Sequence, residues 1–120
     1  MKLILPFLML LSLQSYGSQT SETFIIKMFE EKVRVLAPQK YSSKLGVTIE
    51  NKTLSSLMGK IETQSGKRLA IVNIQPNGFK VVDLNNIPKN QKLFFVPMAP
   101  AFQSVELKFG RSSYEIPPKR

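Results

Sequence analysis

From residue 38 onward the chain runs in short segments in which apolar and polar residues alternate with a period of two. Leu45, Val47 and Ile49, for example, alternate with polar side chains, which is the pattern of a strand with one buried face. Clusters of Gly, Pro, Asn and Ser separate the segments roughly every ten residues. This spacing predicts an all-β, antiparallel sandwich of about seven to eight strands.

The same pattern assigns individual strands. We expect segments 45–50 and 57–62 to be antiparallel neighbours, and segments 69–74 and 79–84 to form a hairpin around Gln75-Pro76-Asn77-Gly78. The most apolar run, 93–96, should be ended by Pro97 and Pro100, because proline lacks the N–H that a sheet needs. Residues 105–109 alternate again and form a late strand.

Residues 20–36 fit two patterns. Phe24, Met28 and Phe29 would share one face of a helix, whereas the β-branched pair Ile25-Ile26 prefers a strand. We favour a strand, and we expect residues 33–37 to open the sandwich.

The first 17 residues have the order of an export signal. Lys2 is followed by an apolar run over 3–13 and by small residues at Ser15 and Gly17. The run is shorter than the ~20 residues that span a bilayer. We therefore expect a cleaved signal peptide at 1–17, an N-terminal segment at 18–31, the β-sandwich domain at 32–116 and a basic tail at 117–120. The protein should be periplasmic or secreted, with no transmembrane segment in the mature chain.

The composition excludes most catalytic chemistry. The chain has no histidine, cysteine or tryptophan, and Asp83 is its one aspartate, so the usual imidazole base, thiolate nucleophile and soft metal ligands are missing. We expect no disulfide, no catalytic residue, no cofactor and no metal site. The enzyme alternative is Glu62 or Glu106 acting beside a lysine.

The charge favours anionic partners. Without residues 1–17 the chain has 103 residues and a formal charge of +8. Thirteen lysines against four arginines disfavour specific nucleic-acid reading, which depends on the forked guanidinium. We expect the partner to be an envelope or extracellular protein, and an anionic glycan or lipid surface stays open as a second class.

Candidate partner-binding residues form a basic group and an apolar group. The basic group should face solvent and comprises Lys60, Lys67, Arg68, Lys80, Lys89, Lys92, Lys108 and Arg111. The apolar group comprises Phe94, Val96, Met98 and Phe102. The alternatives are an ordinary solvated surface for the lysines, some of which would protect sheet edges, and a covered central strand for the apolar group.

One connection resembles a known family. Leu84-x-x-Ile87, followed by Leu93 and Phe95 on one strand face, is similar to the link between the fifth and sixth strands of immunoglobulin-like and fibronectin type III domains. That family places an aromatic residue where this chain has Leu93, and the chain also lacks the paired cysteines and core tryptophan. The resemblance implies a Greek-key, immunoglobulin-like sandwich and an adhesion or assembly role, without an active site.

These observations predict an exported, non-catalytic β-sandwich that docks on a partner protein or an anionic envelope surface. One alternative is a structural subunit of a surface filament or secretion assembly, held by β-strand addition through residues 24–29. A second alternative is an inhibitor of a secreted enzyme.

Overall fold

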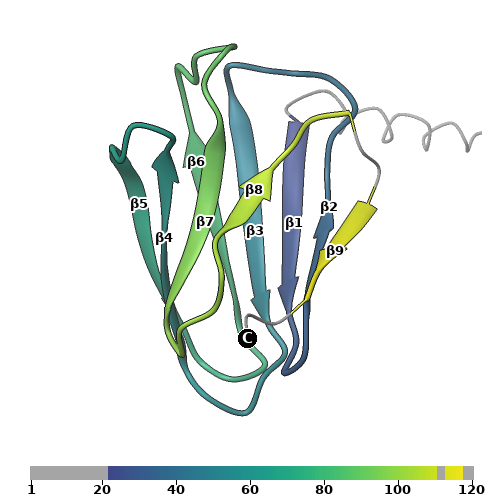
Figure 1. The fold of residues 1–120 in the computed structure, drawn as a ribbon, viewed down its shortest axis with the longest axis vertical. Coiled ribbons are helices and arrows are strands. Elements are labelled where there is room, and N and C mark those ends of the chain that lie inside the picture. The colour runs from purple at the N-terminus through teal and green to yellow at the C-terminus, as the bar shows by residue number, and fades with distance from the viewer. Residues whose placement is uncertain (1–21, 111–112, 118–120) are drawn as a thin grey trace, which may run out of the picture.

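The computed structural model describes residues 22–110 and 113–117. The strands of this part are β1 (Glu22–Met28), β2 (Val33–Leu36), β3 (Leu45–Asn51), β4 (Leu57–Thr63), β5 (Arg68–Ile74), β6 (Phe79–Leu84), β7 (Leu93–Ala99), β8 (Val105–Leu107) and β9 (Ser113–Ile116). One sheet has the order β6-β3-β1-β2-β9 and the other β5-β4-β7-β8 (Figure 1). The all-β prediction is confirmed, with nine strands where seven to eight were expected. The expected signal peptide lies outside the described residues.

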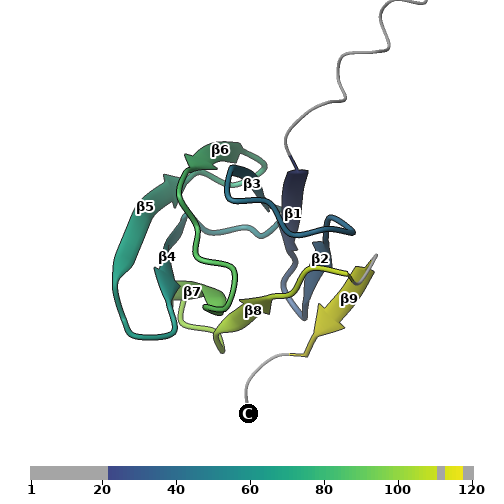
Figure 2. The ribbon, with the colours of Figure 1, turned by 90° about the horizontal axis from the view of Figure 1, so that it is seen from above.

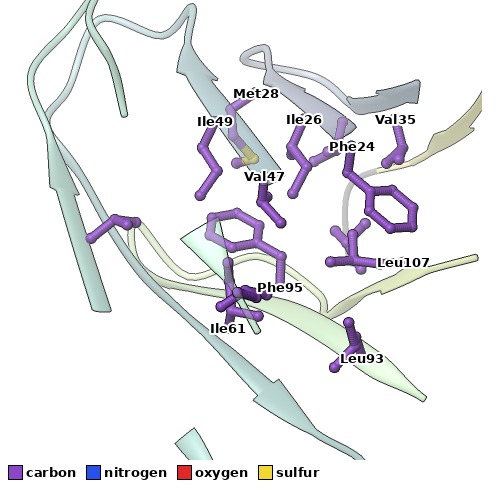
Figure 3. Packing of buried hydrophobic residues seen from close by; sticks show 14 of the residues in the cluster. Phe24, Ile26, Met28, Val35, Val47, Ile49, Ile61, Leu93, Phe95 and Leu107 are labelled. Atoms are coloured by element: carbon purple, nitrogen blue, oxygen red, sulfur yellow. The ribbon is translucent and has the colours of Figure 1, made fainter. Parts of the chain in front are cut away.

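The two sheets face each other, as the view from above shows (Figure 2), and one hydrophobic core lies between them. Alternate residues of the strands point inward, and the largest side chains among them are completely buried (Figure 3). Each such side chain contributes about 1.5–3 kcal/mol by leaving water. The main contributors are Phe24, Ile26, Ile49, Leu57, Ile61, Leu93 and Phe95.

The ambiguous N-terminal segment forms strands, as we favoured. Phe24, Ile26 and Met28 of β1 are all buried, a period of two that fits a strand and not a helix. The sandwich therefore opens with β1 and not with residues 33–37. β1 pairs antiparallel with β2 but parallel with β3, so the prediction of a purely antiparallel fold was wrong. β2 ends at the end of the sheet at which β1 begins. Residues 37–44 connect β2 to β3 at that same end, on the other side of β1, so β3 runs parallel to β1.

Two predicted strand pairs were wrong. β5 and β6 lie in different sheets, and so do β3 and β4; the actual antiparallel pairs are β4 with β5 and β3 with β6. Alternation fixes which side of a strand is buried but not the sheet to which the strand belongs. The turn after β5 crosses between the sheets, and its Asn77 N–H donates to the carbonyl of Asn51 at 2.8 Å.

β7 continues past Pro97 to Ala99, the residue before Pro100, so of the two prolines expected to end this strand Pro100 does so and Pro97 does not. The register with β4 shifts near this point, since Gly59 faces Pro97 while Met58 faces Ala99. Met98 is thus the extra residue of a bulge. A bulge is a place where a strand tolerates proline.

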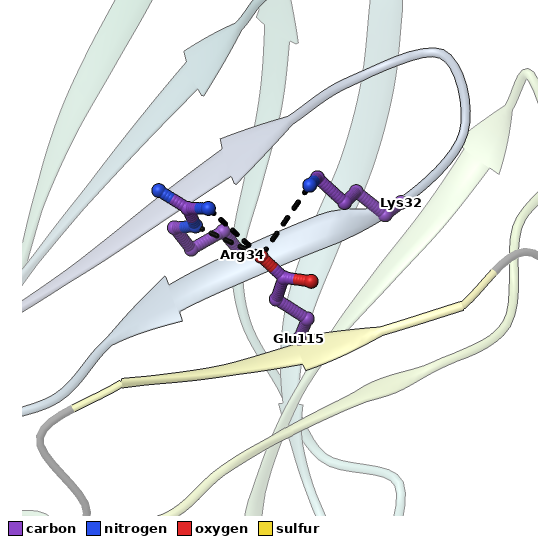
Figure 4. Close-up of polar contacts among 3 residues, drawn as sticks. All are labelled: Lys32, Arg34 and Glu115. Carbon is purple, nitrogen blue, oxygen red and sulfur yellow. Dashed lines mark hydrogen bonds and ion pairs between the residues drawn. The ribbon is translucent and has the colours of Figure 1, made fainter.

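The short edge strand β9 is tied to β2 by charged side chains (Figure 4). The Arg34 guanidinium donates two hydrogen bonds to Glu115 Oε2, at 2.8 and 3.1 Å. Lys32 Nζ lies 3.4 Å from the same oxygen. The hydrogen bond from Arg34, helped by the charge of Lys32, lowers the pKa of Glu115 below its usual value.

Candidate functional site

The directions of the strands bring several loops to one end of the sandwich. β2, β4 and β6 all run toward this end, so the loops 37–44, 64–67 and 85–92 that follow them lie there together (Figure 1). β8 runs the same way, and residues 108–110 follow it. Segments far apart in the sequence therefore share one surface.

Hydrogen bonds join loop 37–44 to loop 85–92. The Tyr41 hydroxyl donates to the carbonyl of Ile87, and the N–H of Ile87 donates to the carbonyl of Ser43 at 3.1 Å. Ile87 is itself buried. Both backbone polar groups of Ile87 are thus satisfied by one neighbouring loop, which fixes the position of loop 85–92.

Two more backbone hydrogen bonds extend this connection. The N–H of Gln64 donates to the carbonyl of Lys92 at 2.9 Å, and the N–H of Gly110 donates to the carbonyl of Pro38 at 2.9 Å. Every loop at this end is therefore bonded to a neighbour. The backbones of these loops are held at fixed relative positions.

This surface is strongly basic. Its cations are all exposed, and we call the set the basic end: Lys40, Lys44, Lys67, Arg68, Lys89, Lys92 and Lys108. Segments 37–44, 64–68, 85–92 and 108–110 contain no acidic residue, and the acidic residues at this end include Glu22, at the start of β1, and Asp83, near the end of β6. Within the described part of the chain, no member of the basic end forms an ion pair.

The opposite end of the sandwich differs in charge. Its loop 29–32 carries Glu30, Glu31 and Lys32, and its loop 52–56 carries Lys52. Lys52 lies 3.7 Å from Glu50. Charge is therefore roughly balanced there, and the field of the molecule is concentrated at the basic end.

The structure gathers most of the predicted basic residues. Lys67, Arg68, Lys89, Lys92 and Lys108 belong to the basic end, and Arg111 lies outside the described residues. Lys40 and Lys44 were not among the predicted residues. Both stand in an ordinary polar loop, and only the topology brings that loop beside the others.

Two predicted lysines lie elsewhere. Lys60 is in the middle of β4 and pairs with Glu62 at 3.1 Å. Lys80 is on β6, close to the opposite end, and it faces Ile49 of β3. Lys80 is exposed, as expected for the basic group, but it shares the inward side of its strand with Val82 and reaches solvent because β6 is a sheet edge.

A cleft opens within the basic end, between the β4–β5 turn and loop 85–92. It has a volume of about 320 Å³ and is lined by Thr63, Ser65, Lys67, Leu69, Asn85, Asn86, Ile87, Pro88 and Gln91. A second hollow beside it shares Asn85 and includes Lys44 and Asp83. The lining of the first cleft contains one ammonium group, several amides and hydroxyls, and no carboxylate.

The predicted apolar group is only partly brought together. Phe94 and Val96 are half-buried on the outer face of the four-stranded sheet, although β7 is a central strand. Val96 and the exposed Ile71 flank Lys60 on either side. Met98 lies in the bulge, and Phe102 packs partly against the core. The surface of Phe94 and Val96 is thus open, but it does not extend to Phe102.

No protein-family model, no curated protein and no solved structure matches this chain. Among the described residues no helix has the length and apolar character needed to cross a membrane. The same residues contain no group of three carboxylates or other metal-ligating side chains in reach of one ion.

Proposed function

We propose that this protein is an exported, non-catalytic β-sandwich that binds an anionic partner in the cell envelope through its basic end. The observation that carries the proposal is the arrangement of seven exposed cations, which form no ion pair with the described residues, on loops that hydrogen-bond to one another. Export is inferred from residues 1–17 of the sequence.

The geometry suits binding by electrostatic complementarity. Because the loop backbones are already held by hydrogen bonds, only the cationic side chains need ordering when a partner arrives, so less entropy is lost than with mobile loops. A one-sided positive field also accelerates encounters with anionic surfaces. The absence of histidine and cysteine from the sequence supports binding over catalysis, because no usual base or nucleophile is present.

We also infer kinship with immunoglobulin-like sandwiches. The pairs β3–β6 and β4–β7–β8 correspond to the arrangement of that fold, in which the link between β6 and β7 crosses from one sheet to the other. Tyr41 binds the carbonyl of Ile87 in this link, a role that the family gives to a tyrosine at the corner itself. The chain departs from the family in the parallel pairing of β1 with β3.

The proposal is tested by measuring binding to the cell envelope at increasing salt concentration. Protein recovered from the exported fraction should bind its own cell-envelope fraction in low salt, and binding should decline steeply up to about 0.5 M NaCl because exposed charges are screened. Binding that is unchanged over this range would contradict a charge-driven contact. A neutral protein of similar size added to the same fraction reports non-specific retention.

A second candidate function is assembly by strand addition, and the β5 edge favours it. β5 lies at the edge of its sheet and has no charged residue and no proline between Leu69 and Ile74. Such an edge can pair with a strand from another chain. β1, which the sequence analysis considered for this role, already has β2 and β3 on its two sides.

Strand addition is tested at Ile71, which is 52% exposed. Ile71→Lys should abolish any oligomers detected by light scattering, because lysine on an edge opposes pairing. The matched change Val81→Lys alters an exposed position on the edge strand β6. Equal loss in both variants would argue against a specific β5 contact.

A further inference from the structure

We propose that the cleft of the basic end binds an acidic saccharide unit, a pyranose ring that carries a carboxylate or a phosphate group. The inference rests on the proposed function, because it names the class of anion that this end takes. The cleft volume of about 320 Å³ lies at the lower end of the range for small-molecule sites.

The polar groups of the cleft are available for a ligand. The side chains of Lys67, Asn85, Asn86 and Gln91 form no hydrogen bond or ion pair within the described part of the chain. Thr63 differs, since its hydroxyl accepts from the N–H of Lys67 at 3.2 Å and shares a 2.9 Å hydrogen bond with a neighbouring hydroxyl. The free groups therefore converge on the cleft while the turn beneath them is internally bonded.

The chemistry of these groups matches a sugar better than a bare anion. Each of the three amides, on Asn85, Asn86 and Gln91, offers both donors and an acceptor, and sugar hydroxyls also donate and accept. A carboxylate alone can only accept from the amide N–H groups, and a phosphate ion offers few hydroxyl donors, whereas a sugar presents several hydroxyls that can donate to the amide oxygens. The ammonium of Lys67 supplies a charge-assisted hydrogen bond to the acidic group.

The walls add an apolar contact. Leu69, Pro88 and the buried Ile87 line the cleft together with the polar groups. These side chains can pack against the C–H face of a pyranose ring. The cleft thus combines apolar walls with a few directed polar groups, as small-molecule sites usually do.

The loop that carries the amides is held in place without a ligand. Asn86 has a φ of 59°, in the left-handed region that asparagine tolerates. The next residue, Ile87, is bonded on both sides by Tyr41 and Ser43. Preorganisation of this kind reduces the entropy lost when a ligand binds.

The test is an NMR titration of ¹⁵N-labelled protein recovered from the exported fraction. Glucuronate and glucose 6-phosphate are the probes, with glucose, acetate and inorganic phosphate as controls. We expect glucuronate and glucose 6-phosphate, the two acidic sugars, to shift the amide signals of residues 65–67 and 85–91 saturably. Glucose should shift these signals weakly, and acetate and inorganic phosphate should leave them unchanged at the same concentration. Comparison of the two sugar acids shows whether a carboxylate or a phosphate is preferred.

Variants separate the roles of charge and shape. Lys67→Gln should weaken glucuronate binding about tenfold, through loss of one charge-assisted contact, and should leave the weak response to glucose intact. Lys108→Gln removes a charge from the same end outside the cleft lining and should not change the affinity for glucuronate. An equal effect of both variants would show that only overall charge matters.

Three results would overturn the inference. They are the absence of any saturable shift, an acetate or phosphate affinity equal to that of the sugar acids, and unchanged glucuronate affinity in Lys67→Gln. An acetate response would point to an acidic protein side chain as the occupant. If salt-sensitive binding to the envelope fraction persists in any of these cases, the inference fails and the proposed function stands.

Discussion

The Tyr41 hydroxyl donates a hydrogen bond to the backbone carbonyl of Ile87, across 46 residues of sequence. This bond joins the loop after β2 to the loop after β6, and both loops carry members of the basic end. The Tyr41 ring packs edge-on against Phe109, with ring centroids 5.6 Å apart. One side chain thus connects the core to the surface that we propose as the binding site.

Tyr41→Phe keeps the ring and removes the hydroxyl, so it isolates the hydrogen bond. We expect the free energy of unfolding to fall by about 1 kcal/mol, with the carbonyl of Ile87 left short of a partner. Urea unfolding at neutral pH measures this change. An unchanged free energy of unfolding in the variant would mean that this hydrogen bond does not help to hold the two loops together.

Asn51 is completely buried at the end of β3 and uses its whole amide. Its Nδ2 donates to the carbonyls of Ser55 and Ile74 at 2.8 and 3.0 Å, and its Oδ1 accepts from the N–H and hydroxyl of Thr53. Asn51→Asp places an anionic acceptor opposite two carbonyl acceptors. We expect a loss of more than about 2 kcal/mol in the free energy of unfolding.

The control for this change is Asn73→Asp, at an exposed position on β5, which should stay within about 0.5 kcal/mol of the natural protein. Denaturant midpoints of the two variants at pH 7 give the comparison. Equal denaturant midpoints for the two variants would show that the hydrogen bonds of the buried Asn51 amide do not contribute to stability.

Gly59 lets β4 approach the ring of Phe95. A Cβ at this position would lie 2.7 Å from Cε1 of Phe95 and 3.1 Å from the carbonyl oxygen of Val96, so Gly59→Ala should cost about 1–3 kcal/mol through forced repacking. At Gly46 the nearest atom to an added Cβ is 3.4 Å away. Thermal unfolding should therefore show a larger loss for Gly59→Ala than for Gly46→Ala, and the reverse order would contradict the packing.

The contact between Arg34 and Glu115 should make stability depend slightly on acid pH. Because the pKa of Glu115 is lowered in the folded protein, its charged form favours folding above the usual glutamate pKa, and this contribution is lost as the pH falls through the lowered pKa of the folded state. Glu115→Gln should therefore unfold slightly more easily than the natural protein near pH 7 and equally easily in strong acid. The effect is small because the pair is exposed.

Glu31→Gln is the control for the pH dependence, since Glu31 is exposed and has no ion pair within the described residues. Unfolding curves at pH 7 and pH 3 compare the three proteins. A difference for Glu115→Gln that persists unchanged at pH 3 would show that the carboxylate charge is not its cause.

Alternation in the sequence predicted the buried faces well. Leu45, Val47, Leu93 and Phe95 are all buried as expected, because a period of two directly reports which side of a strand avoids water. The partners of strands were harder to predict. The turn after Ile74 looks like a hairpin turn, but it crosses between sheets, and nothing local distinguishes the two geometries.

For the candidate site, too, the exposure of single residues was predictable from the sequence, but their grouping was not. Exposure of Lys67, Arg68, Lys89 and Lys92 followed from the turns that contain them. Their grouping depends on the directions of strands in two sheets, which the sequence pattern does not contain. Lys44 was missed for this reason, although it lies in the same kind of polar loop.

The most direct test of the central claim compares two triple variants of equal net charge. Lys44→Glu/Lys89→Glu/Lys92→Glu reverses charge at the basic end, and Lys27→Glu/Lys52→Glu/Lys80→Glu reverses it toward the other end. Binding to the cell-envelope fraction in low salt is measured for both, with circular dichroism as the check on folding. We predict that the first variant loses binding and the second keeps most of it. Equal loss in the two variants, or retention in the first, would contradict the account.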